Sequence, residues 1–203
     1  DGTLTDSAEG VIRSAQHMQE KMGIPKWADE DLVFIVGPPL LKTFTEDFKM
    51  TEEDAQKALG YFRERYASVG LFENKVYDGV LEMLKALKEK GKRLAVATSK
   101  KEETAVRILK HFQLDTYFEV IGGDDREVGR DTKAKVIEYV LEKMEADKKD
   151  AIMVGDRKFD VEGAHLAGIL CIAIEYGYGG RAEFEACGAD YICATAKNLA
   201  DMF

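Results

Sequence analysis

Acidic residues occupy two places in this chain where a metal ion and a phosphate group could be bound together. The chain opens on Asp1-Gly2-Thr3-Leu4, and Gly155-Asp156 follows the apolar run at residues 151–154, with Asp160 four positions later. We expect both groups at junctions between a strand and a loop. Carboxylate oxygens are ligands that Mg2+ prefers, and the cation offsets the mutual repulsion of clustered carboxylates. The spacing therefore favours a site where a divalent cation lies beside a phosphate.

Two hydroxyl residues follow another apolar segment. The run Leu94-Ala95-Val96-Ala97 is followed by Thr98 and Ser99. We expect the Thr98 hydroxyl to donate a hydrogen bond to a phosphoryl oxygen. Ser99 fits two interpretations equally, a second contact with the phosphate or a cap on the following helix.

Lys133 is the candidate for the positive charge that such a site requires. Carboxylates and a phosphate need a countercharge that stabilises the negative charge as it builds up in the transition state. Lys133 begins a helical pattern at a suitable distance from the Gly155-Asp156 segment, and this favours it over its neighbours. Arg130 and Lys135 lie close enough in the sequence to be alternatives.

The composition describes an ordinary soluble globular protein and argues against several classes of partner. The chain has 203 residues, of which 45% are hydrophobic and 33% are charged, enough for one domain with an added element. The formal net charge of −9 argues against nucleic acid, which needs a broad basic surface. No apolar run approaches the roughly 20 residues of a membrane span and no secretory signal is visible, so we expect a cytoplasmic protein that does not bind a membrane. The sequence gives no indication of the oligomeric state.

The three cysteines give no sign of a disulfide framework or a zinc site. Cys171, Cys187 and Cys193 are odd in number and lack the close spacing of metal ligands. We expect them to be buried thiols.

The order of apolar patterns predicts a block of helices followed by an α/β fold. Helical patterns cover residues 7–22, 31–36 and 40–48, and a fourth begins at the capping residue Thr51. From residue 80 onward, helical patterns at residues 80–90, 101–112, 132–145 and 161–167 alternate with short apolar strands, which we expect at residues 94–98, 118–121, 151–154 and 170–174. This alternation is typical of a parallel sheet with helices on both faces, where ligands bind at the carboxyl ends of the strands.

Four segments in this order resemble the haloacid-dehalogenase superfamily of phosphohydrolases, and most of all its phosphoglycolate-phosphatase-like members, which include nucleotidases. The segments are Asp1-Gly2-Thr3-Leu4, the strand that ends at Thr98, Lys133, and Gly155-Asp156 with Asp160. The resemblance implies a Rossmann-like parallel sheet core with helices on both faces and an inserted all-helical cap of four helices. We expect the core domain at residues 1–8 and 79–203 and the cap domain at residues 9–78, because a block of about 70 residues is far longer than a crossover needs.

The resemblance also implies an activity and a role for each candidate residue. The activity is Mg2+-dependent hydrolysis of a small phosphorylated metabolite through a phosphoaspartate, with Asp1 as general acid and then general base. The backbone carbonyl of Asp1 would also be a Mg2+ ligand, together with Asp156. Asp160 is counted with the metal site, where it would hold Lys133 or a metal-bound water, and capping a helix is its alternative role. The phosphate would be bound by Gly2, Thr3, Thr98, Ser99 and Lys133.

One feature departs from the family pattern Asp-x-Asp-Gly-Thr, whose first aspartate is the nucleophile. The sequence begins at the second aspartate of this pattern. We expect an apolar strand immediately before Asp1, because in the similar fold its loss would leave neighbouring strands with unpaired backbone groups. If the nucleophile is truly absent, the alternative is a phosphate-binding protein with impaired catalysis. A 5'-nucleotidase and a phosphomutase are further alternatives, and the mutase is less favoured because no cap segment stands out as built for a bisphosphorylated sugar.

Specificity is expected to lie in the cap. Arg13, Lys42 and the turn at residues 37–40 are candidates for contacts with the rest of the substrate, and ordinary charge on a helix surface is the alternative for both side chains. The glycine-rich segment Tyr176–Gly180 lacks the pattern of a nucleotide-binding loop, and we expect a flexible turn near the rim of the site.

Overall fold

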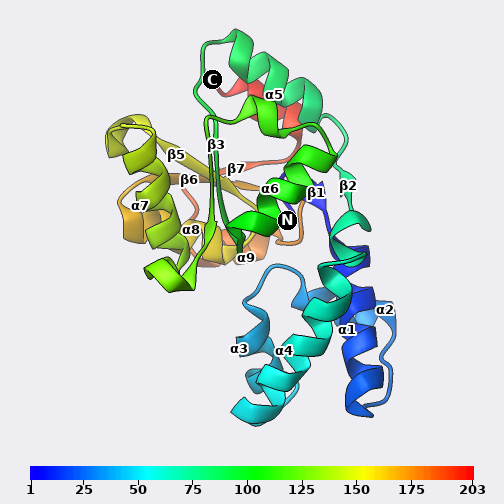
Figure 1. Ribbon diagram of the computed structural model, residues 1–203. Helices are drawn as coiled ribbons and strands as arrows, with labels where there is room; N and C mark the ends of the chain where they lie inside the picture. Colours follow the sequence, from blue (N-terminus) through cyan, green and yellow to red (C-terminus); the bar gives the residue numbers. More distant parts are fainter. The chain divides into compact units, whose positions relative to one another are not determined.

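The computed structural model describes all residues from 1 to 203, and the contacts between Cα atoms divide the chain into two compact units. The helical unit contains Asp1 and Thr5–Lys75, and the α/β unit contains Gly2–Leu4 and Val76–Phe203. In Figure 1 the helices of the helical unit are blue to cyan, and the part of the α/β unit from Val76 onward runs from green to red. The short strands β1 (Thr5–Asp6) and β2 (Lys75–Val76) lie where the chain passes between units and form a two-stranded sheet.

The helical unit consists of α1 (Ala8–Met22), α2 (Asp29–Leu32), α3 (Leu40–Glu46) and α4 (Glu52–Tyr66), with 3-10 turns η1 (Val33–Ile35) and η2 (Gly70–Phe72). Helices α1 and α4 pack against each other. Both bury apolar side chains at a helical spacing: Val11, Ile12, Ala15 and Met18 on α1, and Ala55, Ala58, Leu59 and Phe62 on α4.

The helix boundaries follow from local sequence signals, with one exception. Helix α1 ends at Gly23, which adopts the left-handed conformation that favours glycine. The predicted cap at Thr51 is confirmed, because its Oγ1 accepts a hydrogen bond from the backbone N–H of Asp54 at 3.1 Å. The predicted single helix at residues 31–36 is wrong. A one-turn α2 gives way to the 3-10 turn η1, and the backbone is extended at Val36 before the Gly37-Pro38-Pro39 turn.

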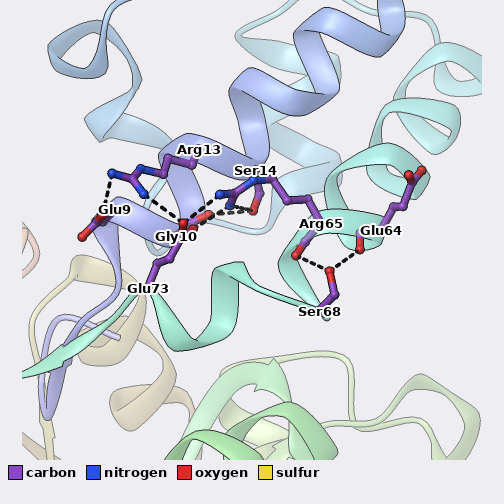
Figure 2. Close-up of polar contacts among 8 residues, drawn as sticks. All are labelled: Glu9, Gly10, Arg13, Ser14, Glu64, Arg65, Ser68 and Glu73. Carbon is purple, nitrogen blue, oxygen red and sulfur yellow. Dashed lines mark hydrogen bonds and ion pairs between the residues drawn. The ribbon is translucent and has the colours of Figure 1, made fainter.

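A polar cluster around Glu73 connects helices α1 and α4 by hydrogen bonds to the segment that precedes β2 (Figure 2). Arg65 on α4 donates two hydrogen bonds to the Glu73 carboxylate, at 2.6 and 2.7 Å. Arg13 on α1 donates a third at 3.0 Å, and the N–H of Gly10 donates to the Glu73 backbone carbonyl, also at 3.0 Å. A Cβ at Gly10 would lie 1.9 Å from the carbonyl oxygen of Gly70, so only glycine permits this approach.

The strands of the α/β unit form two parallel sheets. Strand β3 (Ala95–Lys101) pairs with β4 (Val120–Asp124), and β5 (Ile152–Gly155), β6 (Leu170–Ile174) and β7 (Tyr191–Cys193) pair in that order. Strand β3 is hydrogen-bonded only to β4, and β5 only to β6. The apolar strand that we expect immediately before Asp1 stays a prediction.

Helices cover both faces of the larger sheet, which confirms the predicted α/β class. Along β6, Ile172 and Ile174 pack with α5 (Val80–Glu89) and α10 (Ala196–Asp201), whereas Cys171 and Ala173 pack with α7 (Lys133–Lys143), α8 (Lys158–Ala167) and α9 (Arg181–Ala186). The remaining elements are α6 (Glu102–His111), η3 (Asp115–Tyr117), η4 (Arg126–Val128) and η5 (Lys148–Asp150). The core and cap domains of the prediction remain an interpretation of the two units.

Two further sequence-based expectations concern single features of the chain. All three cysteines are free, and Cys171 on β6 and Cys193 on β7 are buried, while Cys187 is partly exposed. None of the helices combines the length and the apolar character needed to cross a membrane.

Candidate active site

Asp156 lies at the carboxyl end of β5, and its carboxylate is almost completely buried, with 3% of the residue exposed. The Thr3 hydroxyl donates to its Oδ1 at 3.0 Å, and the backbone N–H of Tyr178 donates to its Oδ2 at 3.0 Å. Burial raises the pKa of Asp156, and the negative charge of Asp160 raises it further. A cation beside this carboxylate would offset both effects.

Asp160 lies in the first turn of α8 and uses both of its carboxylate oxygens. Its Oδ2 accepts hydrogen bonds from the backbone N–H groups of Asp156 and Arg157, both at 3.1 Å, so it caps the helix. Its Oδ1 forms an ion pair with Lys133 Nζ at 2.8 Å. Burial alone would raise the pKa of Asp160, but the charge and hydrogen bond of Lys133 hold that pKa below its usual value. Asp160 therefore combines two of its predicted alternatives, the helix cap and the lysine partner.

Lys133 joins three elements at this site. Its Nζ also donates to the carbonyl oxygen of Ala97 at 3.1 Å, where the regular pairing of β3 with β4 ends. A Cβ at Gly163 would lie 2.4 Å from Lys133 Cγ, so a glycine on α8 leaves room for the lysine side chain.

The two alternative cations are held elsewhere. Arg130 forms ion pairs with Glu102 at 2.8 Å and Asp125 at 3.3 Å. Lys135 is exposed and forms an ion pair at 2.8 Å with Asp131, which precedes its helix α7. Of the three candidates, the structure therefore brings only Lys133 into contact with Asp160, the second aspartate after β5.

The Gly2-Thr3 turn lies directly against Asp156. Gly2 has a φ of 68°, and a Cβ at this position would lie 1.8 Å from Asp156 Oδ2. The position thus requires glycine for its conformation and for its contact. The adjacent Thr3 supplies the hydroxyl that bonds Asp156 Oδ1. The segment that begins at Asp1 and the segment after β5 therefore meet at Gly2 and Thr3.

Thr98 and Ser99 lie at the irregular end of β3. The strand continues to Lys101 instead of ending at Thr98, and its register with β4 shifts after Ala97. Thr98 is partly buried, and its Oγ1 accepts a hydrogen bond from the Lys100 N–H at 3.1 Å. Ser99 is exposed, and the interpretation of Ser99 as a helix cap is wrong because α6 has Lys101 at its N-cap.

The segment Tyr176–Gly180 contributes more to the site than the sequence indicated. We expected a flexible turn at the rim, but the N–H of Tyr178 bonds Asp156 Oδ2 and the N–H of Gly179 bonds the Asp156 carbonyl at 2.9 Å. The sequence carries no signal for Glu183 on α9, whose carboxylate accepts a hydrogen bond from the backbone N–H of Lys158 at 2.7 Å. The glycines at positions 177 and 179 were the sequence signal that could have indicated the close contact of this segment with Asp156.

The donor set fits a magnesium ion, although no group of three or more histidine, cysteine or acidic side chains is placed to hold a metal. Mg2+ is commonly bound by one or two carboxylates and completes its shell with water and substrate phosphate oxygens. Asp156 offers a buried hard oxygen ligand with a raised pKa. Asp160 Oδ2 already accepts two hydrogen bonds and its Oδ1 is paired with the Lys133 cation, so the geometry suits a partner of Lys133 better than a metal ligand.

The candidate specificity residues of the helical unit take part in ion pairs within that unit. Arg13 pairs with Glu9 at 2.7 Å and with Glu73 at 3.0 Å. Lys42 is exposed and lies 3.8 Å from Glu46, one helical turn away. These contacts match the alternative interpretation as charge on a helix surface.

The chain belongs to the haloacid dehalogenase-like hydrolase family, whose model matches residues 1–174. The match contains the Gly2-Thr3 turn, Lys133 and Asp156. The predicted family and the prediction of a hydrolase are therefore confirmed.

Several curated relatives and solved structures are similar over nearly the whole chain. A 5'-nucleotidase of Pseudomonas aeruginosa is 38% identical, with 98% of this chain and 90% of the relative covered. The tyrosine-protein kinase PtkA of Mycobacterium tuberculosis is 40% identical over 91% of this chain, which spans only 62% of PtkA. Phosphoglycolate phosphatase 1 of Pseudomonas aeruginosa is 33% identical, with 88% of this chain and 68% of the relative covered. The crystal structure of a predicted phosphatase from Clostridium acetobutylicum has a TM-score of 0.94 and 40% identity. The match covers 100% of this chain and 94% of the chain in that structure. The phosphatase names support the class of phosphoric monoester hydrolases.

Proposed function

We propose that the protein is a Mg2+-dependent phosphatase that hydrolyses small phosphate monoesters through a phosphoaspartate. The observation that carries this proposal is the meeting of the Gly2-Thr3 turn with Asp156, beside the buried Lys133–Asp160 ion pair, in a chain of this hydrolase family. A site with hard oxygen ligands and one fixed cation suits a phosphate ester.

Each residue has a role that its surroundings support. Asp156 and the backbone carbonyl of Asp1 would hold Mg2+, which neutralises charge on the phosphate when bound. Lys133, fixed by Asp160, stabilises the charge that builds up on the transferring group. Thr98, with Ser99 beside it, and the backbone N–H groups of the Gly2-Thr3 turn bind the phosphoryl oxygens.

Proton transfer in this proposal belongs to Asp1. An aspartate two positions earlier would take the phosphoryl group, as in the family pattern. Asp1 protonates the leaving alkoxide and then activates the water that hydrolyses the phosphoaspartate. A leaving alkoxide needs this proton, whereas a halide does not, so an aspartate here supports a phosphatase over a dehalogenase.

Two substrate classes deserve a direct comparison. The 38% identity to a 5'-nucleotidase over nearly all of both chains favours a nucleoside 5'-monophosphate. Phosphoglycolate is the second candidate, supported by the 33% identical phosphoglycolate phosphatase. Initial rates with nucleoside 5'-monophosphates and with phosphoglycolate at equal concentration separate the two. A phosphate-binding protein with impaired catalysis would bind phosphate but hydrolyse neither.

The first prediction tests Asp1. We expect Asp1→Asn to lower p-nitrophenyl phosphate hydrolysis by at least about 100-fold, because general acid–base catalysis typically contributes that much. The melting temperature should stay unchanged. Asp150→Asn, at an exposed position of η5, is the matched control and should keep the parental rate. Parental hydrolysis by Asp1→Asn would disprove the role assigned to this residue.

A further inference from the structure

The loop that follows β6, residues 175–180, contacts the site at three points. The Tyr176 hydroxyl donates to the backbone carbonyl of Thr3 at 3.1 Å. The N–H of Tyr178 donates to Asp156 Oδ2 at 3.0 Å, and the N–H of Gly179 donates to the Asp156 carbonyl at 2.9 Å. The loop thus bonds both the Gly2-Thr3 turn and Asp156, which lie far apart in the sequence.

The loop has no free space on the side that faces the site. A Cβ at Gly177 would lie 2.3 Å from Asp156 Cβ and 2.4 Å from the Gly2 carbonyl oxygen. At Gly179 a Cβ would lie 2.2 Å from the Asp156 carbonyl oxygen. Both distances are well inside van der Waals contact, so the two glycines allow the backbone of the loop to touch the site.

Tyr176 is fixed by the packing of its ring and by the hydrogen bonds of the residue before it. Its ring packs with the core cluster that contains α5 and α10, and it meets the ring of Tyr77 edge to face, with centroids 5.5 Å apart. The preceding Glu175 bonds the Cys193 carbonyl through its N–H at 2.9 Å and accepts a hydrogen bond from Arg181 at 2.9 Å. The phenol oxygen therefore has a defined position relative to the sheet.

The hydrogen bonds of Asp156 show how the position of the Tyr176 hydroxyl affects the orientation of the Asp156 carboxylate. Its Oδ1 accepts from the Thr3 hydroxyl and its Oδ2 from the Tyr178 N–H. Each carboxylate oxygen has two acceptor sites, so each keeps one for another partner. A displacement of Thr3 would remove one of the two bonds that orient the carboxylate.

We infer that Tyr176 is a positioning residue, whose hydroxyl holds the Gly2-Thr3 turn at the distance from which Thr3 orients Asp156 for a divalent cation. The inference depends on the proposed function only in taking Asp156 as a cation ligand. Tyr176 touches neither the cation nor the substrate in this role. It acts through Thr3, and its removal changes the affinity for the cation.

The test compares Tyr176→Phe with Tyr191→Phe, a control at an exposed tyrosine where β7 begins. Binding of Mn2+, as a spectroscopic substitute for Mg2+, is measured by titration on the full chain, together with the Mg2+ concentration that gives half-maximal hydrolysis. We expect roughly tenfold weaker Mn2+ binding for Tyr176→Phe, the usual effect of losing a partner that orients a ligand. Saturating Mg2+ should restore most of the turnover. Equal Mn2+ affinity of Tyr176→Phe and the parent would overturn the inference.

A double-mutant cycle separates positioning from general damage to the fold. Thr3→Val removes the hydroxyl that bonds Asp156 but keeps the shape of the side chain. Because Tyr176 acts through Thr3, the double variant Thr3→Val with Tyr176→Phe should lose less Mn2+ affinity than the product of the two single losses. Independent effects that multiply would contradict the inference. A parent that binds Mn2+ but hydrolyses no ester would refute the proposed function and leave this comparison valid, whereas a parent without Mn2+ binding would refute both.

Discussion

At the scale of single residues, the Lys133–Asp160 ion pair has the largest expected energetic consequence. The two side chains are 12% and 10% exposed. Removal of one partner leaves the other charge buried and unpaired, which costs roughly 3 to 5 kcal/mol in comparable buried pairs. The pair also fixes the position of the positive charge next to Asp160, whose Oδ2 accepts the Asp156 N–H.

We therefore expect Lys133→Met to lower the free energy of unfolding by roughly 3 kcal/mol and to abolish hydrolysis. Denaturant unfolding and p-nitrophenyl phosphate turnover measure the two effects. Adding Asp160→Asn should recover part of the stability, because no unpaired charge remains, but none of the activity. Lys135→Met is the matched control, since Lys135 and Asp131 are 52% and 49% exposed. An equal loss of stability in this control would contradict the argument.

The sequence pointed to these residues but not to their hydrogen-bond partners. Asp156 and Lys133 were recognisable because a carboxylate after an apolar run and a nearby cation are chemically informative. The bond from Thr3 to Asp156 joins residues 153 positions apart, and such a partner depends on the folded arrangement of the chain. Ser99 was misjudged as a possible cap because β3 continues through an irregular register to Lys101.

At the scale of elements, the loop at residues 175–180 makes a sharp prediction about its glycines. Gly177→Ala places a Cβ 2.3 Å from Asp156 Cβ, so the loop or the aspartate must move. We expect at least about tenfold lower hydrolysis and a loss of roughly 1 to 3 kcal/mol in stability from the forced shift. Gly180→Ala is the control, because a Cβ there meets nothing within 4 Å. Equal effects of the two substitutions would argue against a packed loop.

The elements that the sequence predicted correctly have a clear apolar period or a capping residue. Strand β6 was predicted at its observed bounds, and α1, α4 and α5 within a residue or two of theirs. Strand β7 has three residues and helices α9 and α10 have six each, and such short segments carry too little periodic signal to be predicted from the sequence. Helix α8 begins three residues earlier than expected, since the Asp160 carboxylate caps its first turn.

At the scale of the whole molecule, the division into two units means that each has its own stabilising contacts. The Glu73 cluster belongs to the helical unit alone. Its hydrogen bond with Arg65 holds the pKa of Glu73 below the ordinary value of 4.5. A depressed pKa in the folded state contributes stability above the unfolded value, and this contribution is lost as the pH falls through the folded value.

We expect Glu73→Gln to destabilise the helical unit at pH 7 by about 1 kcal/mol, because solvent screens part of the attraction between Glu73 and its arginine partners. The difference from the parent should shrink as the pH falls below 4.5. Thermal unfolding at pH 7 and at acidic pH measures it. Glu46→Gln is the control, because its pair with Lys42 is 61% to 62% exposed. A difference that is independent of pH would contradict the assigned ionisation.

All three cysteines lie in the α/β unit, so thiol-reactive reagents can report on this unit and not on the helical unit. Cys171, Cys187 and Cys193 all fall between Val76 and Phe203. Burial raises the pKa of the Cys171 and Cys193 thiols, which keeps them in the unreactive protonated form while the sheet is intact. Alkylation of these two side chains therefore records each opening of β6 and β7, and it does so without any signal from melting of α1 to α4.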